Sequence, residues 1–371
     1  MTELRTMGWY AQQIAPHLPA EAFKPVRGRL WGGLAYLSLV VGSIVAIGMY
    51  DLHPLQNLGL SVLIGQGFAG LGFLGHEILH GTVVKNARLR DFLGAIAFAQ
   101  FSLGPKLWRK WHNMEHHAHT QEQHTDPDAM GTLEQFYQRP FLRWLYRLHP
   151  SVRSLISFAA FLLFFSVFCL KMLSQFYPEF RREERPVVLA QVIWPFAMWL
   201  SLLVVLGPVK WLFAYVIPLM LANFLVISYI STNHQLNPLT DLNDPLANSL
   251  SVNVPRWMDV LHFNFSHHVE HHVFPGMNPK YAPLVKAQLR RLFPEQYQEM
   301  GFGQALAALW RTPRIYKDKT DLVDPVRALA FGSLGNGLNP VRIEGRKVAL
   351  AEPLGPAPVP PPGGSQAPAG N

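Results

Sequence analysis

The apolar residues of this chain gather in long runs of the kind that cross membranes as helices. One run covers residues 30–50 and a second covers residues 58–74, each close to the roughly 20 residues that a helix needs to cross the hydrocarbon layer. Lys and Arg precede the first run and follow the second, whereas the link 51–57 carries neither. Because positive residues stay on the cytoplasmic side, the two runs predict a helical hairpin whose outer ends both face the cytoplasm.

Two later runs, 187–206 and 211–230, are separated by Gly207 and Pro208, which favour a sharp turn. They predict a second hairpin that returns the chain to the cytoplasmic side. The shorter run 92–103 predicts an interfacial helix. The run 154–170 is followed by a segment containing Arg181, Arg182 and Arg185, so the positive-inside rule places it in the interface or in a re-entrant segment. Its Phe and Leu content would equally suit a fifth span.

These patterns predict an all-α, multi-pass membrane protein. We expect about four transmembrane helices in two hairpins, together with interfacial helices and a cytoplasmic cap rich in histidine. Residues 1–28 are expected to form a cytoplasmic N-terminal arm and residues 29–324 the membrane domain. Residues 325–371 end in a run rich in Pro, Gly and Ala, and we expect them to be disordered.

Composition supports a membrane protein and excludes several classes of site. Hydrophobic residues make up 49% of the chain and charged residues only 15%, well below the roughly 25% charged content of soluble domains. The net charge of +8 comes from basic residues near the ends of the apolar runs, which indicates membrane topology and no nucleic-acid partner. Cys169 is the only cysteine, so the chain alone can build neither a disulfide nor an iron–sulfur cluster.

Histidine clustering carries the functional argument, because most of the 16 histidines fall in three short clusters. His76 and His80 stand one helical turn apart at the end of the second span, so both imidazoles lie on one helical face. The second cluster contains His112, His116, His117 and His119, and the third contains His267, His268, His271 and His272. In an α-helix His112 and His116 would share a face, with His117 turned about 100° away, so one element could reach two metals.

Clusters of this kind predict a site with more than one metal ion. Imidazole suits iron, zinc, copper and nickel, whereas magnesium and calcium prefer oxygen ligands. A single histidine is more often an ordinary interfacial or core residue with a satisfied hydrogen bond. Three clusters beside spans that emerge on one membrane face are poorly explained in that way.

The residues around the clusters resemble the membrane fatty acid desaturase family, whose pattern is three histidine boxes on one side of the membrane. The resemblance runs from about His76 to Pro294. It rests on GHEILHG, on HHAHT followed by TDPD, and on HVEHHVFPGM followed by PKYAPL. Such context is much more specific than two histidines spaced four apart.

The resemblance implies two iron ions, O2 as co-substrate and desaturation of a lipid acyl chain. The family's boxes correspond here to eight ligands: His76, His80, His112, His116, His117, His268, His271 and His272. The family often supplies one more ligand after the last span, and His234 stands at that place. In acyl-CoA desaturases an Asn one turn earlier holds a metal-bound water. Ile230 occupies that position here, so Asn233 or another group would have to substitute.

Other polar residues in the clusters have two interpretations. The box glutamates could orient imidazoles or could be ordinary solvated helix residues; they are Glu77, Glu115 and Glu270. Asp126 and Asp128 could likewise hold imidazoles or simply form a turn. The histidines left outside the ligand set are His119, His124, His262 and His267. Three tryptophans are expected to be interfacial anchors, namely Trp108, Trp111 and Trp257.

Electrons must come from a separate carrier, a ferredoxin or cytochrome b5 with its reductase, because the chain has no flavin, nicotinamide or haem motif. Six basic residues could form a docking face for such an acidic carrier, although positive-inside contact with lipid explains them equally well. They are Arg109, Lys110, Lys280, Lys286, Arg290 and Arg291. A bacterial inner membrane and an endoplasmic reticulum membrane fit the composition equally.

Two other functions remain open at this point. A di-iron membrane hydroxylase or ketolase acting on an alkyl, carotenoid or sterol substrate would need the same metal and oxidant, and would differ only in the fate of the substrate radical. A non-enzymatic metal-binding membrane protein would instead place its polar ligands within the bilayer.

Overall fold

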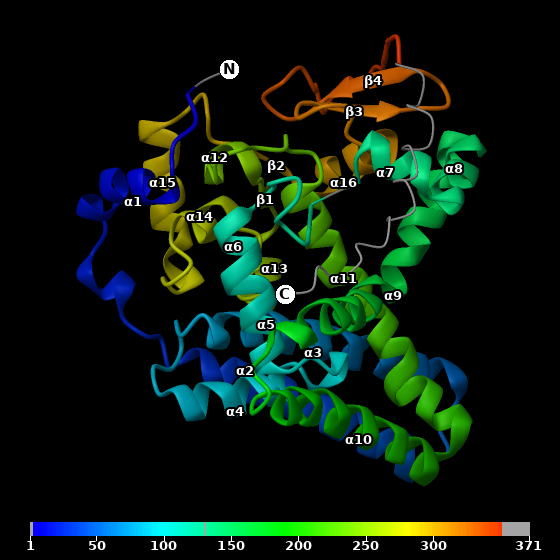
Figure 1. Ribbon diagram of the computed structural model, residues 1–371. Coiled ribbons are helices and arrows are strands. Elements are labelled where there is room, and N and C mark those ends of the chain that lie inside the picture. The colour runs from blue at the N-terminus through cyan, green and yellow to red at the C-terminus, as the bar shows by residue number, and fades with distance from the viewer. Residues whose placement is uncertain (1–2, 130, 351–371) are drawn as a thin grey trace, which may run out of the picture.

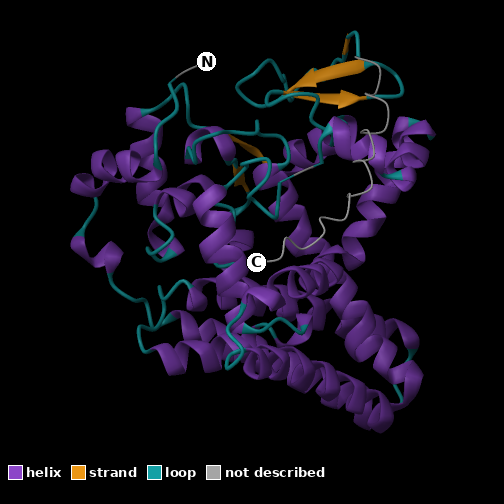
Figure 2. Ribbon diagram, in the orientation of Figure 1, coloured by secondary structure: helices purple, strands orange, loops and turns teal. Residues whose placement is uncertain are grey.

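The computed structural model describes residues 3–129 and 131–350, and helices dominate these residues (Figures 1 and 2). The helices in chain order are α1 (Met7–Ile14), α2 (Arg29–Met49), α3 (Pro54–Leu79), α4 (Ala87–Ala97), α5 (Pro105–Trp108), α6 (His117–His119), α7 (Leu133–Gln138), α8 (Pro140–Arg147), α9 (Pro150–Phe176), α10 (Arg185–Trp211), α11 (Ile217–His234), α12 (Pro245–Asn248), α13 (Arg256–Leu261), α14 (His268–Val273), α15 (Ala282–Leu292) and α16 (Phe302–Arg311). The strands are β1 (Ser251–Asn253), β2 (Glu299–Gly301), β3 (Asp321–Asp324), β4 (Leu329–Gly332) and β5 (Arg346–Lys347).

Four helical stretches are long and apolar enough to cross a membrane. They are Arg29–Met49, Pro54–Leu79, Pro150–Glu179 and Arg185–His234. The last contains both α10 and α11, because the chain reverses at Gly207, whose φ of 74° is open to glycine without strain. A π-helical turn, η6 (Leu212–Val216), then leads into α11.

The first hairpin pairs α2 with α3. Pro54 opens α3 at the first helical position, where its missing N–H costs no hydrogen bond. Gly70 of α3 lets the two helices approach closely, because a Cβ there would collide with the ring of Tyr36 on α2. The far ends of both hairpins then meet, since Lys210 Nζ donates to the carbonyl oxygens of Gly48 at 3.0 Å and Tyr50 at 3.2 Å. The two predicted hairpins are therefore present.

We call residues 3–28, 105–148 and 235–350 the cap. They lie beyond the open ends of both hairpins, opposite the ends that Lys210 joins. In the cap, α1 packs beside α14 and α15, and Tyr10 donates to Asp244 at 3.2 Å. The strands β1 and β2 pair in parallel, and β3, β4 and β5 form an antiparallel sheet. The N-terminal arm is thus anchored on the cap and is not a free extension.

The helix α9 runs well beyond the predicted segment 154–170, and both of its ends contact the cap. Near its start, Arg153 Nη1 lies 2.6 Å from Asp324 Oδ2. Just past its end, Lys110 Nζ lies 2.8 Å from Glu179 Oε2. Its middle contacts α11, where the Ser166 N–H donates to Asn223 at 2.8 Å. The helix is also long and apolar enough to span, so the expectation that 154–170 lies in the interface or re-enters stays a prediction.

The prediction of disorder from residue 325 onward is wrong as far as residue 350. Val323 of β3 and Ala330 of β4 face each other in the ladder and are fully buried. Arg346 of β5 forms an ion pair with Asp321 of β3. A short antiparallel ladder with one buried face explains why this segment folds although its turns are rich in Gly and Pro. The remaining residues of the predicted tail, 351–371, lie outside the described residues.

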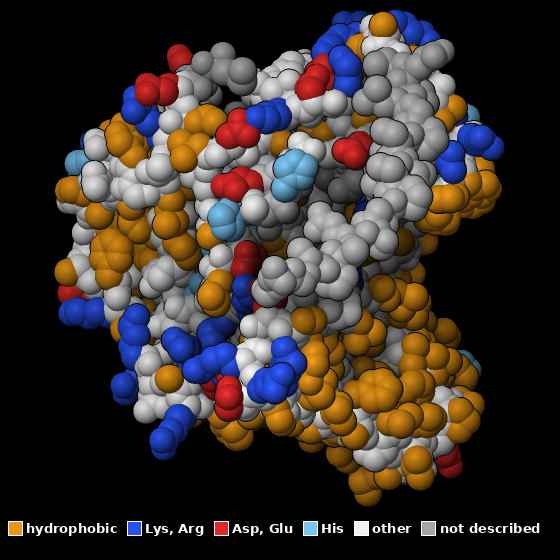
Figure 3. Space-filling model, in the orientation of Figure 1, with side chains coloured by type: hydrophobic (Ala, Val, Ile, Leu, Met, Phe, Trp, Pro, Cys, Tyr) orange, Lys and Arg blue, Asp and Glu red, His pale blue; other side chains and the backbone are white. Residues whose placement is uncertain are grey.

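Apolar side chains cover the outside of the hairpin layer. In Figure 3 they dominate the lower right of the visible face, over α10 and its neighbours, whereas charged side chains gather over the cap and at its junction with that layer. Val204 and Val205 near the end of α10 are 84% and 78% exposed. Large contiguous apolar exposure marks a binding or membrane surface, and the length of these helices favours the membrane.

Candidate metal centre

The structure brings together all nine histidines that the sequence singles out as ligands. Their ring nitrogens form two groups, in each of which the facing atoms lie within 4.8 Å of one another. Group A consists of His76, His80, His112, His117 and His271, and group B consists of His116, His234, His268 and His272. The two groups are adjacent, since the ring centroids of His117 and His272 are 4.5 Å apart.

In group A the Nε2 atoms converge on a common centre. His112 Nε2 lies 3.0 Å from His76 Nε2 and 3.1 Å from His117 Nε2. His271 Nε2 is likewise 3.1 Å from His117 Nε2. Two ligands bound at about 2.1 Å and at right angles on one metal would be separated by about 3 Å. The spacing of these nitrogens therefore fits a shared metal ion.

The second cluster divides its ligands differently from an α-helix, because residues Arg109–His116 form a π-helix, η4. The N–H of His117 consequently donates to the carbonyl of His112, five residues earlier. This winding places His112 and His117 in group A and His116 in group B. His112 and His116 thus belong to different groups, although their rings stack with centroids 5.3 Å apart. One element contributes histidines to both groups, as expected. Single π turns occur frequently at functional sites.

In group B the other ring nitrogen is held by protein acceptors. His234 Nδ1 lies 3.1 Å from the carbonyl of Asn248, which can only accept, so the ring proton must be on Nδ1. His234 Nε2 then carries no proton and has a free lone pair, and it lies 2.7 Å from His268 Nε2. An imidazole fixed in this tautomer is oriented to bind a metal through Nε2.

His116 is held in the same way by carboxylates. Its Nδ1 lies 3.0 Å from Asp126 and 3.4 Å from Asp128, and both the imidazole and Asp126 are buried. Thr120 Oγ1 lies 3.3 Å from the Nδ1 of His272. Asp126 and Asp128 therefore contact an imidazole, as one of their two interpretations supposed. Metal-binding histidines in proteins usually have a partner of this kind on their second nitrogen.

Most cap histidines in the two groups carry no charge. Burial, reinforced by the neighbouring imidazoles, lowers the pKa of His112, His117, His268 and His272 well below the usual range. Burial also lowers the pKa of His271 to about 3. His116 differs: burial opposes its protonation, but the two carboxylates outweigh burial and raise its pKa to about 9. Neutral imidazoles are the form that binds metals.

The donor set fits metal ions that prefer nitrogen. Both groups contain only imidazole, and Cys169, which is buried on α9, belongs to neither. His80 Nε2 is buried and has no hydrogen-bond partner among the described residues, which a metal ion in group A would remedy. Iron, zinc, copper and nickel accept such ligands, whereas calcium and magnesium do not favour them.

The box glutamates neither orient these imidazoles nor lie free in solvent. Glu77 is buried, contacts Arg29 of α2 at 2.5 Å and accepts from Asn278 at 3.0 Å. Glu115 pairs with Lys110 at 2.5 Å. Glu270 accepts from Tyr297 at 2.6 Å and so ties α14 to the segment before β2. Both interpretations of these glutamates were wrong, because they fasten the elements that carry the histidines.

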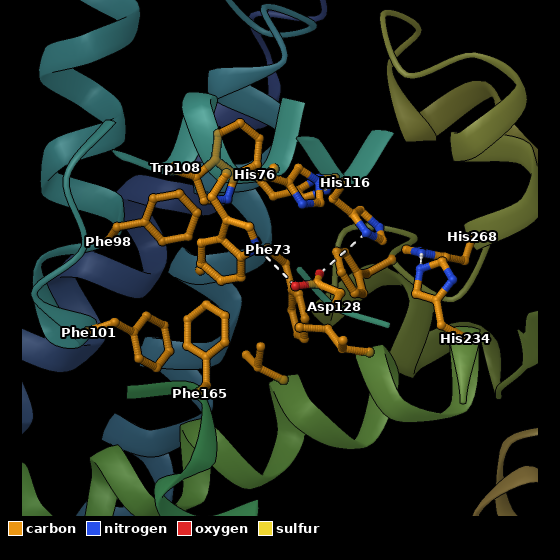
Figure 4. Close-up of a pocket in the computed structure, with 16 residues that line it drawn as sticks. Phe73, His76, Phe98, Phe101, Trp108, His116, Asp128, Phe165, His234 and His268 are labelled. Atoms are coloured by element: carbon orange, nitrogen blue, oxygen red, sulfur yellow. Dashed lines mark hydrogen bonds and ion pairs between the residues drawn. The ribbon is translucent and has the colours of Figure 1, made fainter. Parts of the chain in front are cut away.

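An apolar cavity borders both histidine groups (Figure 4). It has an empty volume of about 560 Å³, which includes the space at its open mouth. The figure shows phenylalanine rings on one side of the cavity and His116, His234 and His268 on the other, with His76 beside Trp108. The aromatic lining residues are Phe73, Phe98, Phe101, Trp108, Trp111, Phe165 and Phe265, and the histidines are His76, His112, His116, His234 and His268.

Two of the three tryptophans have a different place from the one predicted. Trp108 and Trp111 are each only 3% exposed and line the cavity, so they are not interfacial anchors. Trp111 Nε1 also donates to Asp128 at 2.9 Å. Trp257 is 64% exposed, as an anchor would be. Trp111 lies inside because η4 turns it toward Phe165 and Phe168 of α9. Trp108, the last residue of α5, packs against Phe98.

Sequence reasoning missed several residues of the site. Thr120 and Asn248 each contact an imidazole. Thr120 ends the HHAHT motif, but nothing in the sequence marks its hydroxyl as a partner of His272, and Asn248 belongs to no recognisable motif. Ile230 lines the cavity, so the position that the resemblance would give to an Asn is apolar here. Asn233 is buried, and its amide has no hydrogen-bond partner among the described residues.

The basic docking face loses most of its free charge in the structure. Arg109 pairs with Asp91, and Lys110 contacts both Glu115 and Glu179. Lys286 and Arg290 both pair with Glu299, at 3.0 and 2.6 Å. Of the six proposed residues, only Lys280 and Arg291 have no carboxylate within 4.0 Å among the described residues. A face neutralised in this way is a weak attractant for an acidic carrier.

Comparison with known proteins agrees with this geometry. A family model described as "Fatty acid desaturase" matches residues 53–304. An sn-1 oleoyl-lipid 12-desaturase of Synechocystis sp. is 22% identical over 338 residues, which cover 87% of this chain and 92% of that protein. A chloroplastic omega-6 fatty acid desaturase of Spinacia oleracea is 24% identical over 286 residues, covering 73% of this chain and 61% of the plant protein.

A zeaxanthin 4-ketolase of Chlamydomonas reinhardtii is 40% identical, but only over 65 residues, which are 16% of this chain and 14% of the ketolase. The family match is much broader, since it takes in α3, the whole second hairpin and all three histidine clusters. The chain therefore belongs to the fatty acid desaturase family, a family of oxidoreductases.

Proposed function

We propose that this protein introduces a double bond into an acyl chain of a membrane lipid, at a centre of two iron ions held by the nine histidines of groups A and B. The observation that carries the proposal is that members of both groups line one apolar cavity. Group A would hold one ion through five imidazoles, and group B would hold the other through four.

The chemistry of the substrate explains why such a centre is needed. A methylene of an acyl chain has no acidic proton and no leaving group, so side-chain acids, bases and nucleophiles cannot remove its hydrogens. Bound iron supplies the activation of O2 that this removal requires. The protein's own part is to place the reacting carbons and to keep other reactants away.

The cavity residues suit that part. Phe101, Phe165 and Val226 line the cavity and would give an acyl chain apolar contact without hydrogen bonds. His76 of group A and His268 of group B border the same space, so a chain held there passes both groups. Asp126 holds the ring of His116 in one orientation, which keeps its Nε2 directed at group B.

The names of the relatives support a lipid-bound acyl chain as substrate. One relative is named as acting on an oleoyl lipid, and its similarity extends over most of both chains. The apolar helices beside the cap are long enough to cross the bilayer, so such a lipid could reach the centre directly from the membrane.

We also propose that the cap faces the cytoplasm and receives electrons from a separate carrier, a ferredoxin or cytochrome b5. The orientation rests on the Lys and Arg residues near the cap ends of the hairpins, including Arg29, Lys85 and Arg185. A bacterial inner membrane or an endoplasmic reticulum membrane would provide this arrangement.

The second candidate is oxygen insertion, as a hydroxylase or ketolase would perform it. The local similarity to a zeaxanthin ketolase favours it specifically, although that similarity covers a small part of each protein. Desaturation and oxygen insertion would use the same histidines and would differ in where the substrate radical is held.

Product mass separates the two reactions. Membranes containing the protein would receive an acyl lipid labelled with carbon-13, together with a ferredoxin, its reductase, a nicotinamide donor and O2. Loss of two hydrogens from the labelled chain is expected. Gain of an oxygen atom would favour the second candidate, and an unchanged chain in iron-loaded membranes with demonstrated electron transfer would contradict both.

A further inference from the structure

A second cavity lies away from the histidines, between the start of α9, α8 and the segment after α16. Its empty volume is about 730 Å³, including its open side. Three arginines line it, Arg139, Arg153 and Arg314, and no Asp or Glu does. The rest of its wall is largely apolar and includes Leu142, Leu309 and Ile315. A space that combines cationic and apolar walls suits an anionic amphiphile.

Among the residues that the structure describes, only one of the three arginines pairs with a carboxylate. Arg153 Nη1 lies 2.6 Å from Asp324, and that carboxylate is buried with it. Arg139 and Arg314 have no carboxylate within 4.0 Å among the described residues. The cavity wall thus carries about two positive charges in excess, which a ligand of opposite charge would balance.

The guanidinium of Arg314 lacks a hydrogen-bond acceptor among the described residues. Its Nη2 is buried and has no hydrogen-bond partner among the described residues. Its guanidinium carbon lies 5.5 Å from the ring of Phe158 and 5.2 Å from that of Phe161, so the group is held in place by aromatic faces. Burial lowers the pKa of Arg314 only to about 10, so the side chain stays charged at neutral pH. A buried charged donor without an acceptor is costly to the folded state.

The surroundings of this cavity point to the membrane as the source of its ligand. Phe141 and Trp144 on α8 and Val152 and Leu155 on α9 are 62%, 50%, 45% and 60% exposed. These residues lie on the same two short stretches of chain as Leu142, Leu145 and Ser154, which line the cavity. Aromatic residues exposed in this manner are typical of the level of lipid headgroups.

We propose that this cavity binds the phosphate of a membrane lipid headgroup, through the guanidinium groups of Arg314 and Arg139. The planar fork of an arginine matches two phosphate oxygens, and the apolar wall would receive the first part of an acyl chain. Ser157 of this cavity and Phe165 of the histidine cavity are eight residues apart on α9, or about 12 Å along the helix. The lipid site is therefore distinct from the metal centre, and its occupancy can be measured whether or not iron is bound.

Lipid retention tests the proposal. The purified full-length protein would be mixed with micelles of an uncharged detergent that contain phosphatidylglycerol, and the lipid retained per chain after gel filtration would be measured by mass spectrometry. Wild type should retain phosphatidylglycerol, and Arg314→Gln should bind it roughly tenfold more weakly, since hydrogen bonds to charged groups are the strong ones. Arg139→Gln, at an exposed position, should also weaken retention and should not disturb folding.

The controls separate headgroup recognition from general charge and from free anions. Arg311→Gln removes an exposed arginine at the end of α16 that does not line the cavity, and it should retain lipid like wild type. Retention of an uncharged galactosyl diacylglycerol equal to that of phosphatidylglycerol would overturn the proposal. So would wild-type retention in both Arg314→Gln and Arg139→Gln, and so would binding of inorganic phosphate without any retention of phosphatidylglycerol.

Discussion

Replacing Asp126 by Asn should weaken iron binding through His116 without moving a ligand. Asp126 and His116 are 6% and 1% exposed, and their contact is 3.0 Å. Burial opposes a positive charge on His116, yet its pKa is raised to about 9 by Asp126 and Asp128. Compared with the usual value near 6.5, the carboxylates favour positive charge at this ring by about 3 kcal/mol net. A metal ion on Nε2 would draw on the same attraction.

The size of the effect follows from this balance. Asn keeps the shape of Asp126 but carries no charge, and Asp128 at 3.4 Å remains in place. Loss of one such partner typically reduces metal affinity by about 10- to 100-fold, or about 1.4 to 2.7 kcal/mol, which lies within the available attraction. Below about pH 9 His116 of the wild type must lose a proton before it binds a metal, which costs free energy. This free energy of deprotonation is smaller in Asp126→Asn, because one of the carboxylates that favour the protonated ring is gone. The difference between the two proteins should therefore grow as the pH rises from about 6 to about 9.

The assay is iron content per chain, measured by plasma mass spectrometry after dialysis against increasing concentrations of a chelator. Asp241→Asn is the matched control, because it removes an exposed cap carboxylate that pairs with Lys319. Asp126→Asn should lose iron at a lower chelator concentration than either wild type or this control. Equal iron retention by all three proteins across that pH range would refute the role assigned to Asp126.

Three further changes test other parts of the structure. Val226→Phe fills the histidine cavity and should lower turnover roughly 100-fold by displacing the acyl chain while iron content stays normal; normal turnover would refute the cavity as the substrate site. Arg29→Ala leaves Glu77 buried without its charge partner, so thermal unfolding in detergent should show a loss of about 3–5 kcal/mol in the free energy of unfolding, and an unchanged unfolding temperature would count against it. Burial would raise the pKa of Glu299, but its Lys, Arg and Asn partners lower it to about 2, so its stabilising effect is complete above about pH 4.5 and is lost toward pH 2. Glu299→Gln should therefore unfold more readily than wild type at pH 7, with a difference in stability that narrows as the pH falls from about 4.5 toward 2; a constant difference would show that charge is not the cause.

Features that depend on local sequence were predictable. The two hairpins follow from uninterrupted apolar runs, and the break at Gly207 follows from a residue that tolerates positive φ. The three clusters converge because each lies at or near the end of an element that meets the cap. His234, which only the family resemblance suggested, lies in group B beside His268.

Features that depend on tertiary packing were not predictable. The π-helix at Arg109–His116 changes which histidines share a group, and no pattern in the sequence predicts that winding. Glu77 is buried because Arg29 of another helix pairs with it, and these two residues are far apart in sequence. Trp108 and Trp111 face inward for a similar reason, since their aromatic partners are Phe98, directly after α4, and Phe168 of α9. From the sequence alone, these two tryptophans would equally have suited a membrane surface.

The central claim is that the clustered histidines hold the centre that desaturates acyl chains. Its most direct test is the fatty acid profile, by mass spectrometry, of a host that expresses wild type, His271→Ala or His124→Ala at equal levels in the membrane. His271 belongs to group A, whereas His124 is an exposed histidine outside both groups. New unsaturated acyl chains are expected with wild type and His124→Ala and should be absent with His271→Ala. Equal amounts of the same unsaturated chains with His271→Ala would contradict the claim.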